Sequence, residues 1–330
     1  MAETKATILG AGAIGMAMAV VLSETGHKVV FWDIEPTVLD GINKKHLNPR
    51  SLSHIKLEKN VSAESDLQKA VFGAEIVVIA LSSAAVREVA LKLKDSLARN
   101  CVIISASKGL EAGSFAVMTD VIYQSLGAMR DQIFALSGPT LAGELAAKKP
   151  AAAVLASTKA NTYSKRAVDA LSTSWFHITE TRDLKGVQIA AVAKHAIAIL
   201  FGMVDGLGYG ANAKGWLLME ALRDMARLVW KNGGQENTVY GLAGLGDALA
   251  TSLSIESRNR MFGELLGKGK TTTKALSIIN QTVEGAEAVE ALYKLAQKEK
   301  LNLPTLQALY EVVNLKKDVQ KVMVDLLNSF

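Results

Sequence analysis

The chain has 330 residues, of which 49% are hydrophobic and 21% are charged, a composition within the range of globular proteins. A chain of this length can bury more than one hydrophobic core, so we expect two domains. The net charge of +5 comes without a dense lysine and arginine tract interleaved with aromatic residues, which disfavours nucleic-acid binding. The surplus charge then has two interpretations, a solvated basic surface or attraction of an anionic ligand.

Cysteine content and the N-terminal segment both indicate in which cellular compartment the protein is found. The single cysteine, Cys101, excludes an internal disulfide and leaves too few thiols for a cysteine-based zinc cluster, so we expect no metal site. Residues Met1–Lys5 run directly into an apolar stretch and lack the features of a signal peptide. These observations favour a cytoplasmic protein.

The first half of the chain alternates short apolar runs with amphipathic segments. The apolar runs predict buried strands over Ala6–Leu9, Val29–Trp32, Ile76–Leu81, Val102–Ser105, Ile133–Leu136 and Ala152–Ala156. The segments between them predict helices over Ile14–Glu24, Ala63–Phe72, Ala85–Ala98 and Phe115–Leu126. This alternation predicts an α/β fold with a Rossmann-type, doubly wound sheet that is mostly parallel and covered on both faces.

After about Thr181 the strand patterns stop and an all-helical domain is expected. Apolar spacing predicts helices over Asp183–Leu207, Ala211–Asn232, Leu245–Thr251, Arg258–Leu266, Thr272–Gln281, Gly285–Lys298 and Pro304–Leu315. The change in periodicity places a dinucleotide-binding domain over residues 1–181 and a helical substrate and catalytic domain over residues 182–330.

The apolar stretch at residues 187–204 is long enough to raise the question of a membrane span. Gln188, Lys194 and His195 interrupt it. A lysine near the centre of a bilayer costs roughly 2.5–3.5 kcal/mol. We therefore predict a buried helix and no membrane insertion.

A glycine-rich segment, Gly10-Ala11-Gly12-Ala13-Ile14-Gly15, follows the first predicted strand and opens the first predicted helix. In that context Gly10 permits a tight turn, Gly12 lets the backbone approach a pyrophosphate, and Gly15 allows close packing of helix on strand. The N–H groups at the start of the helix would meet the phosphates. The segment therefore predicts a dinucleotide site, with a turn needed only for packing as the alternative.

Asp33 ends the second predicted strand, about twenty residues beyond the glycines, where an acid hydrogen-bonds the adenosine ribose. A carboxylate there repels a 2′-phosphate, and no arginine stands in the next three positions, so NAD is favoured over NADP. NADP stays open, because Lys44, Lys45 or Arg50 could fold back on a phosphate. Asp33 could also be only a turn residue.

Lys194 is the only charged residue in the stretch from 187 to 204. Burial would push a lysine toward its neutral form, which is the form that a general base requires. The alternative is a lysine whose stem is buried and whose amine reaches the surface. The neighbouring His195 is a second candidate for proton transfer, or a hydrogen-bonded structural residue.

Polar residues elsewhere cluster in three segments. Lys108 follows the fifth predicted strand, and Ser137–Thr140 follows the sixth, at the edge where doubly wound sheets bind ligands. In the helical half, Asp247 and Thr251 are four residues apart and would share a helix face, while Arg258 offers a planar fork suited to phosphate. Turns, caps and surface residues are the alternatives for these segments.

These segments together resemble the NAD(P)-dependent glycerol-3-phosphate dehydrogenase family over nearly the whole chain. The motifs that carry the resemblance are GAGAIG at its start, SKGLE at Ser107–Glu111, SGPTLAGE at Ser137–Glu144, GVQIAAVAKHAIAI from Gly186, DGLGYGANAK at Asp205–Lys214, GLAGLGDALATS at Gly241–Ser252, SRNR at Ser257–Arg260 and VEG at Val283–Gly285.

The resemblance implies roles for individual residues, with Lys194 as the residue that transfers the proton. It implies catalytic roles for Lys194, Asp247, Thr251 and Lys108. It implies substrate contacts at Lys108, Gly138, Thr140, Lys194, His195, Asp247, Ser257, Arg258 and Asn259, with the phosphate against Arg258 and Asn259. It implies cofactor contacts at Gly10, Gly12, Ala13, Ile14, Gly15, Asp33, Lys108, Ala142, Arg258 and Glu284.

Three residues depart from the family pattern. His195 stands where an asparagine is usual, Ala248 where a leucine is usual, and Ser252 where a cysteine is usual. The segment from His46 to Leu57 is also shorter than usual, which puts cofactor contacts there in doubt. Because His195 occupies a substrate-contacting position, we expect this departure to affect substrate identity or acid-base balance.

The resemblance implies an enzyme that interconverts sn-glycerol 3-phosphate and dihydroxyacetone phosphate with NAD or NADP, forms a homodimer, and supplies glycerol 3-phosphate for phospholipid synthesis. A related hydroxyacid or polyol-phosphate dehydrogenase with the same lysine and cofactor is the first alternative. A non-catalytic nucleotide-sensing module is the second, and the joint presence of Lys194, Asp247 and Arg258 counts against it.

Overall fold

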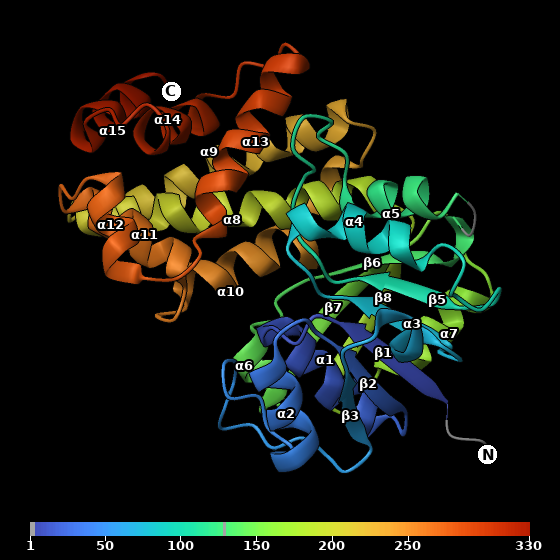
Figure 1. Cartoon of the computed structure of the whole chain (residues 1–330). Helices are drawn as coiled ribbons and strands as arrows, with labels where there is room; N and C mark the ends of the chain where they lie inside the picture. The colour runs from blue at the N-terminus through green and yellow to red at the C-terminus, as the bar shows by residue number, and fades with distance from the viewer. Residues whose placement is uncertain (1–3, 128–129) are drawn as a thin grey trace. The chain divides into compact units, whose positions relative to one another are not determined.

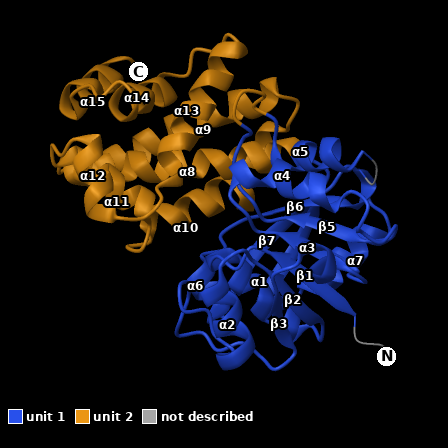
Figure 2. Cartoon of the chain, in the orientation of Figure 1, with its two compact units in different colours: residues 1–111, 116–184 blue, residues 112–115, 185–330 orange. Residues whose placement is uncertain are grey.

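The computed structural model describes residues 4–127 and 130–330, and the chain divides into two compact units (Figure 2). Unit 1 comprises Met1–Glu111 and Ala116–Leu184, and unit 2 comprises Ala112–Phe115 and Lys185–Phe330. Met1–Glu3, which belong to the segment examined for a signal peptide, lie outside the described residues. The domain boundary predicted after residue 181 stays a proposal.

Unit 1 is built on an eight-stranded sheet with the order β3-β2-β1-β4-β5-β6-β7-β8 (Figure 1). Neighbouring strands pair in parallel, except that β6 and β7 pair antiparallel. The strands are β1 (Lys5–Leu9), β2 (Lys28–Trp32), β3 (Val61–Glu64), β4 (Ile76–Ile79), β5 (Val102–Ser105), β6 (Ile133–Ser137), β7 (Ala151–Ala156) and β8 (Phe176–Thr181).

The six predicted strands are present, with ends that differ by at most two residues, but β3 and β8 were not predicted. These two strands form the edges of the sheet, so they are less buried and carry polar residues that interrupt an apolar run. The helix predicted from Ala63 is wrong at its start, because Ala63 and Glu64 belong to β3 and the helix there spans only Leu67–Val71.

Helices cover both faces of the sheet, which confirms the predicted Rossmann-type fold. One face packs on α1 (Ala13–Glu24), α2 (Pro36–Lys45), α6 (Ala142–Ala146) and α7 (Thr162–Leu171). The other face packs on α3 (Leu67–Val71), α4 (Ser83–Leu93) and α5 (Met118–Leu126). Alternate residues of the central strands enter the two cores, as Ile8 and Leu9 of β1 do.

Unit 2 is helical, and its described residues contain no strand. Its elements are α8 (Leu184–Gly206), α9 (Ala211–Lys231), a 3₁₀ turn (Glu236–Tyr240), a π-helical turn (Leu242–Gly246), α10 (Asp247–Leu253), α11 (Arg258–Gly267), α12 (Thr272–Ile279), α13 (Glu284–Lys298), α14 (Pro304–Val313) and α15 (Val319–Asn328). All seven predicted helices are present, and α15 was not predicted. The combination of this region with the sheet of unit 1 confirms the predicted fold class.

Helix α8 is long and apolar enough to cross a membrane, but the apolar part of it is completely buried in the structure. This burial confirms the prediction of a buried helix. Because α8 carries Lys194 and His195, two polar side chains of the predicted site are placed inside a tightly packed region.

Candidate active site

The glycine-rich loop of unit 1 joins β1 to α1 and depends on close backbone contacts. Gly10 has a φ of +97°, in the left-handed region that favours glycine. A methyl group at Gly15 would lie 2.1 Å from the carbonyl oxygen of Gly10, whereas one at Gly12 would meet no atom within 4 Å. The loop is therefore tightly packed beneath Gly15 and open above Gly12.

The start of α1 has the properties of an anion site. Gly12 is its N-cap residue, no side chain of the described structure caps its N–H groups, and no acidic residue stands in its first turn. Free N–H groups and the helix dipole favour a negative group there. The open space at Gly12 lies at this same helix end, so the residues present fit the pyrophosphate of a dinucleotide.

Asp33 ties the glycine-rich loop to the end of β2. One oxygen of its carboxylate accepts a hydrogen bond from the Ala11 N–H at 2.8 Å, and the other accepts one from the Glu35 N–H at 3.0 Å. Each oxygen has a second lone pair available for a hydroxyl of a ribose. The geometry therefore fits a ribose contact and also explains Asp33 as a structural link.

Asn48 supports the same loop and was missed by the sequence analysis. Its buried side chain donates a hydrogen bond to the carbonyl oxygen of Ala11 at 2.6 Å. It lies in the segment from 46 to 57, where no motif signals such a contact. Of the basic residues near this loop, Arg50 forms an ion pair with Glu35 at 2.7 Å, and Lys44 forms one with Asp40 at 2.9 Å.

Two further loops of unit 1 follow β5 and β6, which are neighbours in the sheet. In the first loop, the Ser107 hydroxyl donates to the carbonyl oxygen of Leu81 at 2.7 Å, which joins the ends of β4 and β5 just before Lys108. In the second, the Thr140 hydroxyl donates to the carbonyl oxygen of Gly138 at 3.1 Å, and α6 begins at Ala142. Parallel strands place both loops at one edge of the sheet.

In unit 2, Lys194 of α8 forms a buried ion pair with Asp247 of α10. The ammonium nitrogen lies 2.7 Å from a carboxylate oxygen of Asp247, and the two residues are 8% and 1% exposed. The hydroxyl of Thr251 donates to the same oxygen at 3.4 Å. A buried charge is tolerated when it is paired and hydrogen-bonded, so the lysine is held near a carboxylate instead of reaching water.

The segment before Asp247 is a π-helical turn over Leu242–Gly246, where the sequence predicted an ordinary helix from Leu245. A methyl group at Gly244 would lie 2.0 Å from the carbonyl oxygen of Val239, so only glycine permits this close contact. Such turns widen a helix locally and often stand at functional sites. Here the turn sets the position from which Asp247 begins α10.

Two pairs of glycines bring α8 and α11 into close contact. A methyl group at Gly202 would lie 2.0 Å from the carbonyl oxygen of Arg260, and one at Gly263 would lie 2.0 Å from that of Ile199. One turn further along, methyl groups at Gly206 and Gly267 would lie 2.4 and 2.5 Å from backbone oxygens of the other helix. The backbones of the two helices therefore touch, which places the start of α11 against the part of α8 that carries His195.

The start of α11 contains an exposed arginine with no ion pair to any residue that the structure describes, Arg258. Ser257 is the N-cap residue, and its hydroxyl accepts a hydrogen bond from the Arg260 N–H at 3.2 Å. Arg260 itself forms an ion pair with Asp205 at 2.8 Å. Burial alone would raise the pKa of Asp205, but hydrogen bonds from Lys214 and Arg260 lower it below its ordinary value.

A hydrogen-bonded chain connects three helices beside the lysine. Asn259 of α11 lies 2.8 Å from Nδ1 of His195, and its side-chain oxygen accepts a hydrogen bond from the Gly285 N–H of α13 at 2.9 Å. On the other side of the imidazole, Nε2 lies 3.5 Å from a carboxylate oxygen of Glu284. His195, Asn259 and Glu284 are thus brought together by side chains of α8, α11 and α13.

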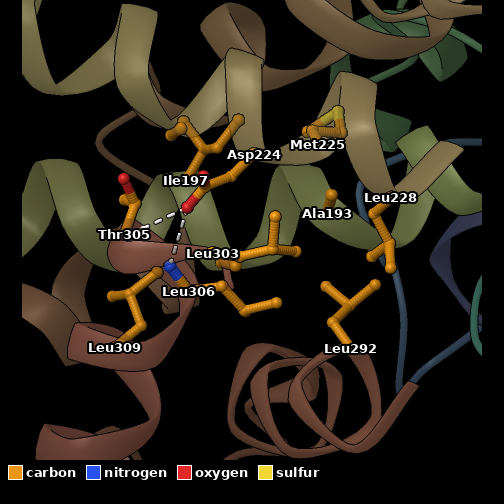
Figure 3. Close-up of a pocket in the computed structure, with 12 residues that line it drawn as sticks. Ala193, Ile197, Asp224, Met225, Leu228, Leu292, Leu303, Thr305, Leu306 and Leu309 are labelled. Atoms are coloured by element: carbon orange, nitrogen blue, oxygen red, sulfur yellow. Dashed lines mark hydrogen bonds between the residues drawn. The ribbon is translucent and has the colours of Figure 1, made fainter. Parts of the chain in front are cut away.

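A second buried carboxylate, Asp224 of α9, was not predicted. It accepts hydrogen bonds from the N–H groups of Thr305 and Leu306 at 2.8 and 3.3 Å, so it caps α14 from another helix (Figure 3). Burial raises the pKa of Asp224 to about 6. The carboxylate borders a cavity of about 30 Å³. The other walls of this cavity are almost wholly apolar and include Ile197, Leu292 and Leu309.

Comparison with known proteins identifies the family. Profiles of the NAD-dependent glycerol-3-phosphate dehydrogenase N-terminus and C-terminus match residues 5–163 and 183–324. The glycerol-3-phosphate dehydrogenase (NAD(P)+) of Staphylococcus aureus strain JH9 is 36% identical over 98% of both chains. The crystal structure of a glycerol-3-phosphate dehydrogenase from Coxiella burnetii superimposes with a TM-score of 0.91 at 33% identity, covering 98% of this chain and 99% of that one.

A more distant structure, glycerol-3-phosphate dehydrogenase from Saccharomyces cerevisiae, has a TM-score of 0.86 at 23% identity over 98% of this chain and 99% of that one, and shares the fold. The two profiles cover most of the chain and follow its order. The resemblance carried by the motifs is therefore confirmed, and this chain belongs to the NAD-dependent glycerol-3-phosphate dehydrogenase family.

Proposed function

We propose that this chain interconverts sn-glycerol 3-phosphate and dihydroxyacetone phosphate with NAD or NADP. The observation that carries the proposal is the buried pair of Lys194 and Asp247 in a chain that belongs to this family. A lysine kept at depth by a carboxylate can exchange a proton with a substrate oxygen without competition from bulk water.

In the reductive direction, the Lys194 ammonium would donate its proton to the carbonyl oxygen of dihydroxyacetone phosphate. In the oxidative direction, the neutral amine would take the proton of the C2 hydroxyl. The nicotinamide supplies the hydride chemistry at C2 when it is bound. Asp247 keeps the amine in place in both states, and Thr251 fixes the carboxylate oxygen that the amine contacts.

Unit 1 would bind the cofactor through the backbone of Gly10, Gly12, Ala13, Ile14 and Gly15. The open space at Gly12 and the uncapped start of α1 support a pyrophosphate there. Asp33 would accept a hydrogen bond from the adenosine ribose. We expect NAD to be favoured over NADP, since Arg50 is engaged by Glu35 and the carboxylate of Asp33 repels a 2′-phosphate.

The substrate phosphate would lie at the start of α11. Arg258 is exposed there, and the N–H groups of a helix start add a partial positive charge. Ser257 already caps this helix, so we assign it a supporting role. The proposed substrate contacts in unit 1 are Lys108, Gly138 and Thr140. The proposed cofactor contacts outside the glycine-rich loop and Asp33 are Lys108, Ala142, Arg258 and Glu284.

We also propose a homodimer in the cytoplasm that supplies glycerol 3-phosphate for phospholipid synthesis. The exposed apolar residues Trp216, Met219 and Trp230 of α9 support association with a second copy. The single buried cysteine agrees with a reducing compartment. Light scattering coupled to gel filtration measures the oligomeric state directly, and a monomer at micromolar concentration would contradict the dimer.

The decisive experiment is an initial-rate assay of dihydroxyacetone phosphate reduction with NADH and NADPH side by side. We expect turnover with both and a higher kcat/KM with NADH. A panel of 2-oxo acids and other keto-phosphates tests the alternative of a related hydroxyacid or polyol-phosphate dehydrogenase, which the unusual His195 keeps open. A higher kcat/KM for a 2-oxo acid than for dihydroxyacetone phosphate would overturn the proposal.

A further inference from the structure

The protonation state of His195 follows from the groups that surround it. Its imidazole is buried, and Nδ1 lies 2.8 Å from the side-chain nitrogen of Asn259. One of these two nitrogens must donate the hydrogen bond and the other must accept it. An amide nitrogen can only donate, so the contact requires a proton-free Nδ1, provided that the Asn259 amide is oriented as the structure has it.

The orientation of Asn259 is fixed by the backbone. The other atom of its amide group, Oδ1, accepts a hydrogen bond from the Gly285 N–H at 2.9 Å. A backbone N–H is a donor only, so a flipped amide would place its NH₂ group against another donor. The amide nitrogen must therefore face His195. The imidazole is then neutral, with its proton on Nε2.

The groups around His195 have opposite effects on the protonation of its imidazole. Glu284 of α13 lies 3.5 Å from Nε2 and favours a charged imidazole, but its side chain is 57% exposed and water screens it. Lys194, the sequence neighbour of His195, is paired with Asp247 at 2.7 Å. Arg258, the sequence neighbour of Asn259, is exposed, so water screens its charge as well. Neither therefore decides whether the imidazole gains a positive charge. The buried donor of Asn259 opposes it most directly, since a protonated Nδ1 would leave two donors facing each other.

We propose that His195 is a positioning residue that stays neutral at physiological pH and takes no part in proton transfer. Its Nδ1 holds Asn259 in place, and through Asn259 it holds the first turn of α11, where Arg258 stands. This inference rests on the proposed function, because the first turn of α11 is the proposed phosphate site. After its contact with His195, the Asn259 amide keeps one N–H for a ligand.

Nitrogen-15 NMR of histidine tests the protonation state without any catalytic turnover. The chain has five histidines, so the His195 signals can be assigned by their loss in His195→Asn. We expect the pattern of a neutral ring protonated on Nε2, unchanged from about pH 6 to pH 8. The exposed His177 serves as a control ring in the same samples. A charged ring at pH 6, or a ring protonated on Nδ1, would overturn the proposal.

Kinetics and ligand binding test the positioning role. His195→Ala should raise KM for dihydroxyacetone phosphate about tenfold, the expected effect of one lost hydrogen bond, and should change KM more than kcat. His195→Asn restores an oxygen that can accept from Asn259 and should recover most of the loss. His177→Asn is the matched control. The stabilisation of the protein by inorganic phosphate, measured as a rise in Tm, should weaken in His195→Ala and return in His195→Asn.

The outcomes separate this inference from the proposed function. A protein that does not reduce dihydroxyacetone phosphate but shows the Nε2-protonated ring and the phosphate response would contradict the proposed reaction and retain the inference. Loss of an ionisation from the pH profile of kcat in His195→Asn would show that the ring carries the proton, and would overturn the inference. If His195→Ala does not fold, the proposal is still tested by the NMR signals of the wild-type ring and by the kinetics of His195→Asn.

Discussion

The glycine-rich loop of unit 1 and the lysine cluster of unit 2 prepare their sites by different means. The loop is one contiguous segment, and it offers backbone N–H groups at the start of α1. The cluster consists of the side chains of Lys194 and His195 of α8, Asp247 of α10, Asn259 of α11 and Glu284 of α13, from helices that are far apart in the sequence. Both depend on glycines that let backbones touch, at Gly15 in the loop and at Gly202 and Gly263 in the cluster.

The difference suggests a division of work. Backbone N–H groups stabilise an anion and cannot exchange protons, so the loop of unit 1 is suited to holding a cofactor. Lysine and aspartate side chains do titrate, so the cluster of unit 2 is suited to chemistry. Substitutions of Lys194, Asp247 or Asn259 should then change turnover and substrate binding while cofactor binding is retained.

The largest effect is expected from Lys194→Ala. Loss of a general acid-base group should lower kcat by roughly 10²–10⁴-fold. NADH binding, measured by fluorescence titration, should be nearly unchanged because the proposed cofactor contacts of the glycine-rich loop lie in unit 1. Lys185→Ala, at an exposed position on the same helix, is the control. Wild-type turnover in Lys194→Ala would refute the mechanism and leave Lys108 as the next candidate.

A smaller effect, mainly on substrate binding, is expected from Arg258→Lys. A lysine keeps the charge but cannot form the two parallel hydrogen bonds that a guanidinium makes to phosphate. KM for dihydroxyacetone phosphate should rise by about tenfold or more, a larger factor than the rise in KM for NADH. Arg223→Lys, on an exposed face of α9, controls for the loss of an arginine. An unchanged substrate KM would place the phosphate elsewhere.

The glycine contact between α8 and α11 can be tested through stability. Gly202→Ala should lower the free energy of unfolding by about 1–3 kcal/mol, because the added methyl group meets a backbone oxygen that cannot move alone. Gly215→Ala is a matched control within α9, since a methyl group there meets no atom within 4 Å. That variant should instead gain about 0.5–1 kcal/mol from its helix propensity. Urea denaturation measures the free energy of unfolding of both variants. Equal changes in the two would contradict the close contact at Gly202.

The same contrast between backbone and side-chain sites explains what could be predicted from the sequence. The glycine-rich loop is contiguous, so its spacing alone indicates the site, and Lys194 was noticeable because a charge in a long apolar run needs a partner. The partner contacts of His195 and Asn259 could not be predicted, since they depend on how α8 crosses α11. Asn48 and Asp224 were missed for the same reason, because each supports a backbone segment that is distant in the sequence.

The smallest expected effect is a change in stability with pH that comes from Asp224. Whereas Asp247 pairs with a lysine, this buried carboxylate caps a helix. Its pKa, raised by burial to about 6, exceeds that of an unfolded aspartate, so the folded state binds the proton more tightly. The stability that this proton binding provides is complete below about pH 4 and is lost as the pH rises through about 6.

Asp224→Asn keeps an oxygen for the N–H groups of Thr305 and Leu306 but cannot ionise. Relative to this variant, the wild type should lose about 1 kcal/mol of unfolding free energy between pH 5 and pH 7, measured by urea denaturation. Asp205→Asn is the control, because the lowered pKa of Asp205 confines its effect to lower pH, where its stabilisation is lost as the carboxylate becomes protonated. A difference between wild type and Asp224→Asn that stays constant over this range would mean that Asp224 is already ionised at pH 5. In that case the two N–H groups of α14 would compensate its burial as fully as Lys194 compensates that of Asp247.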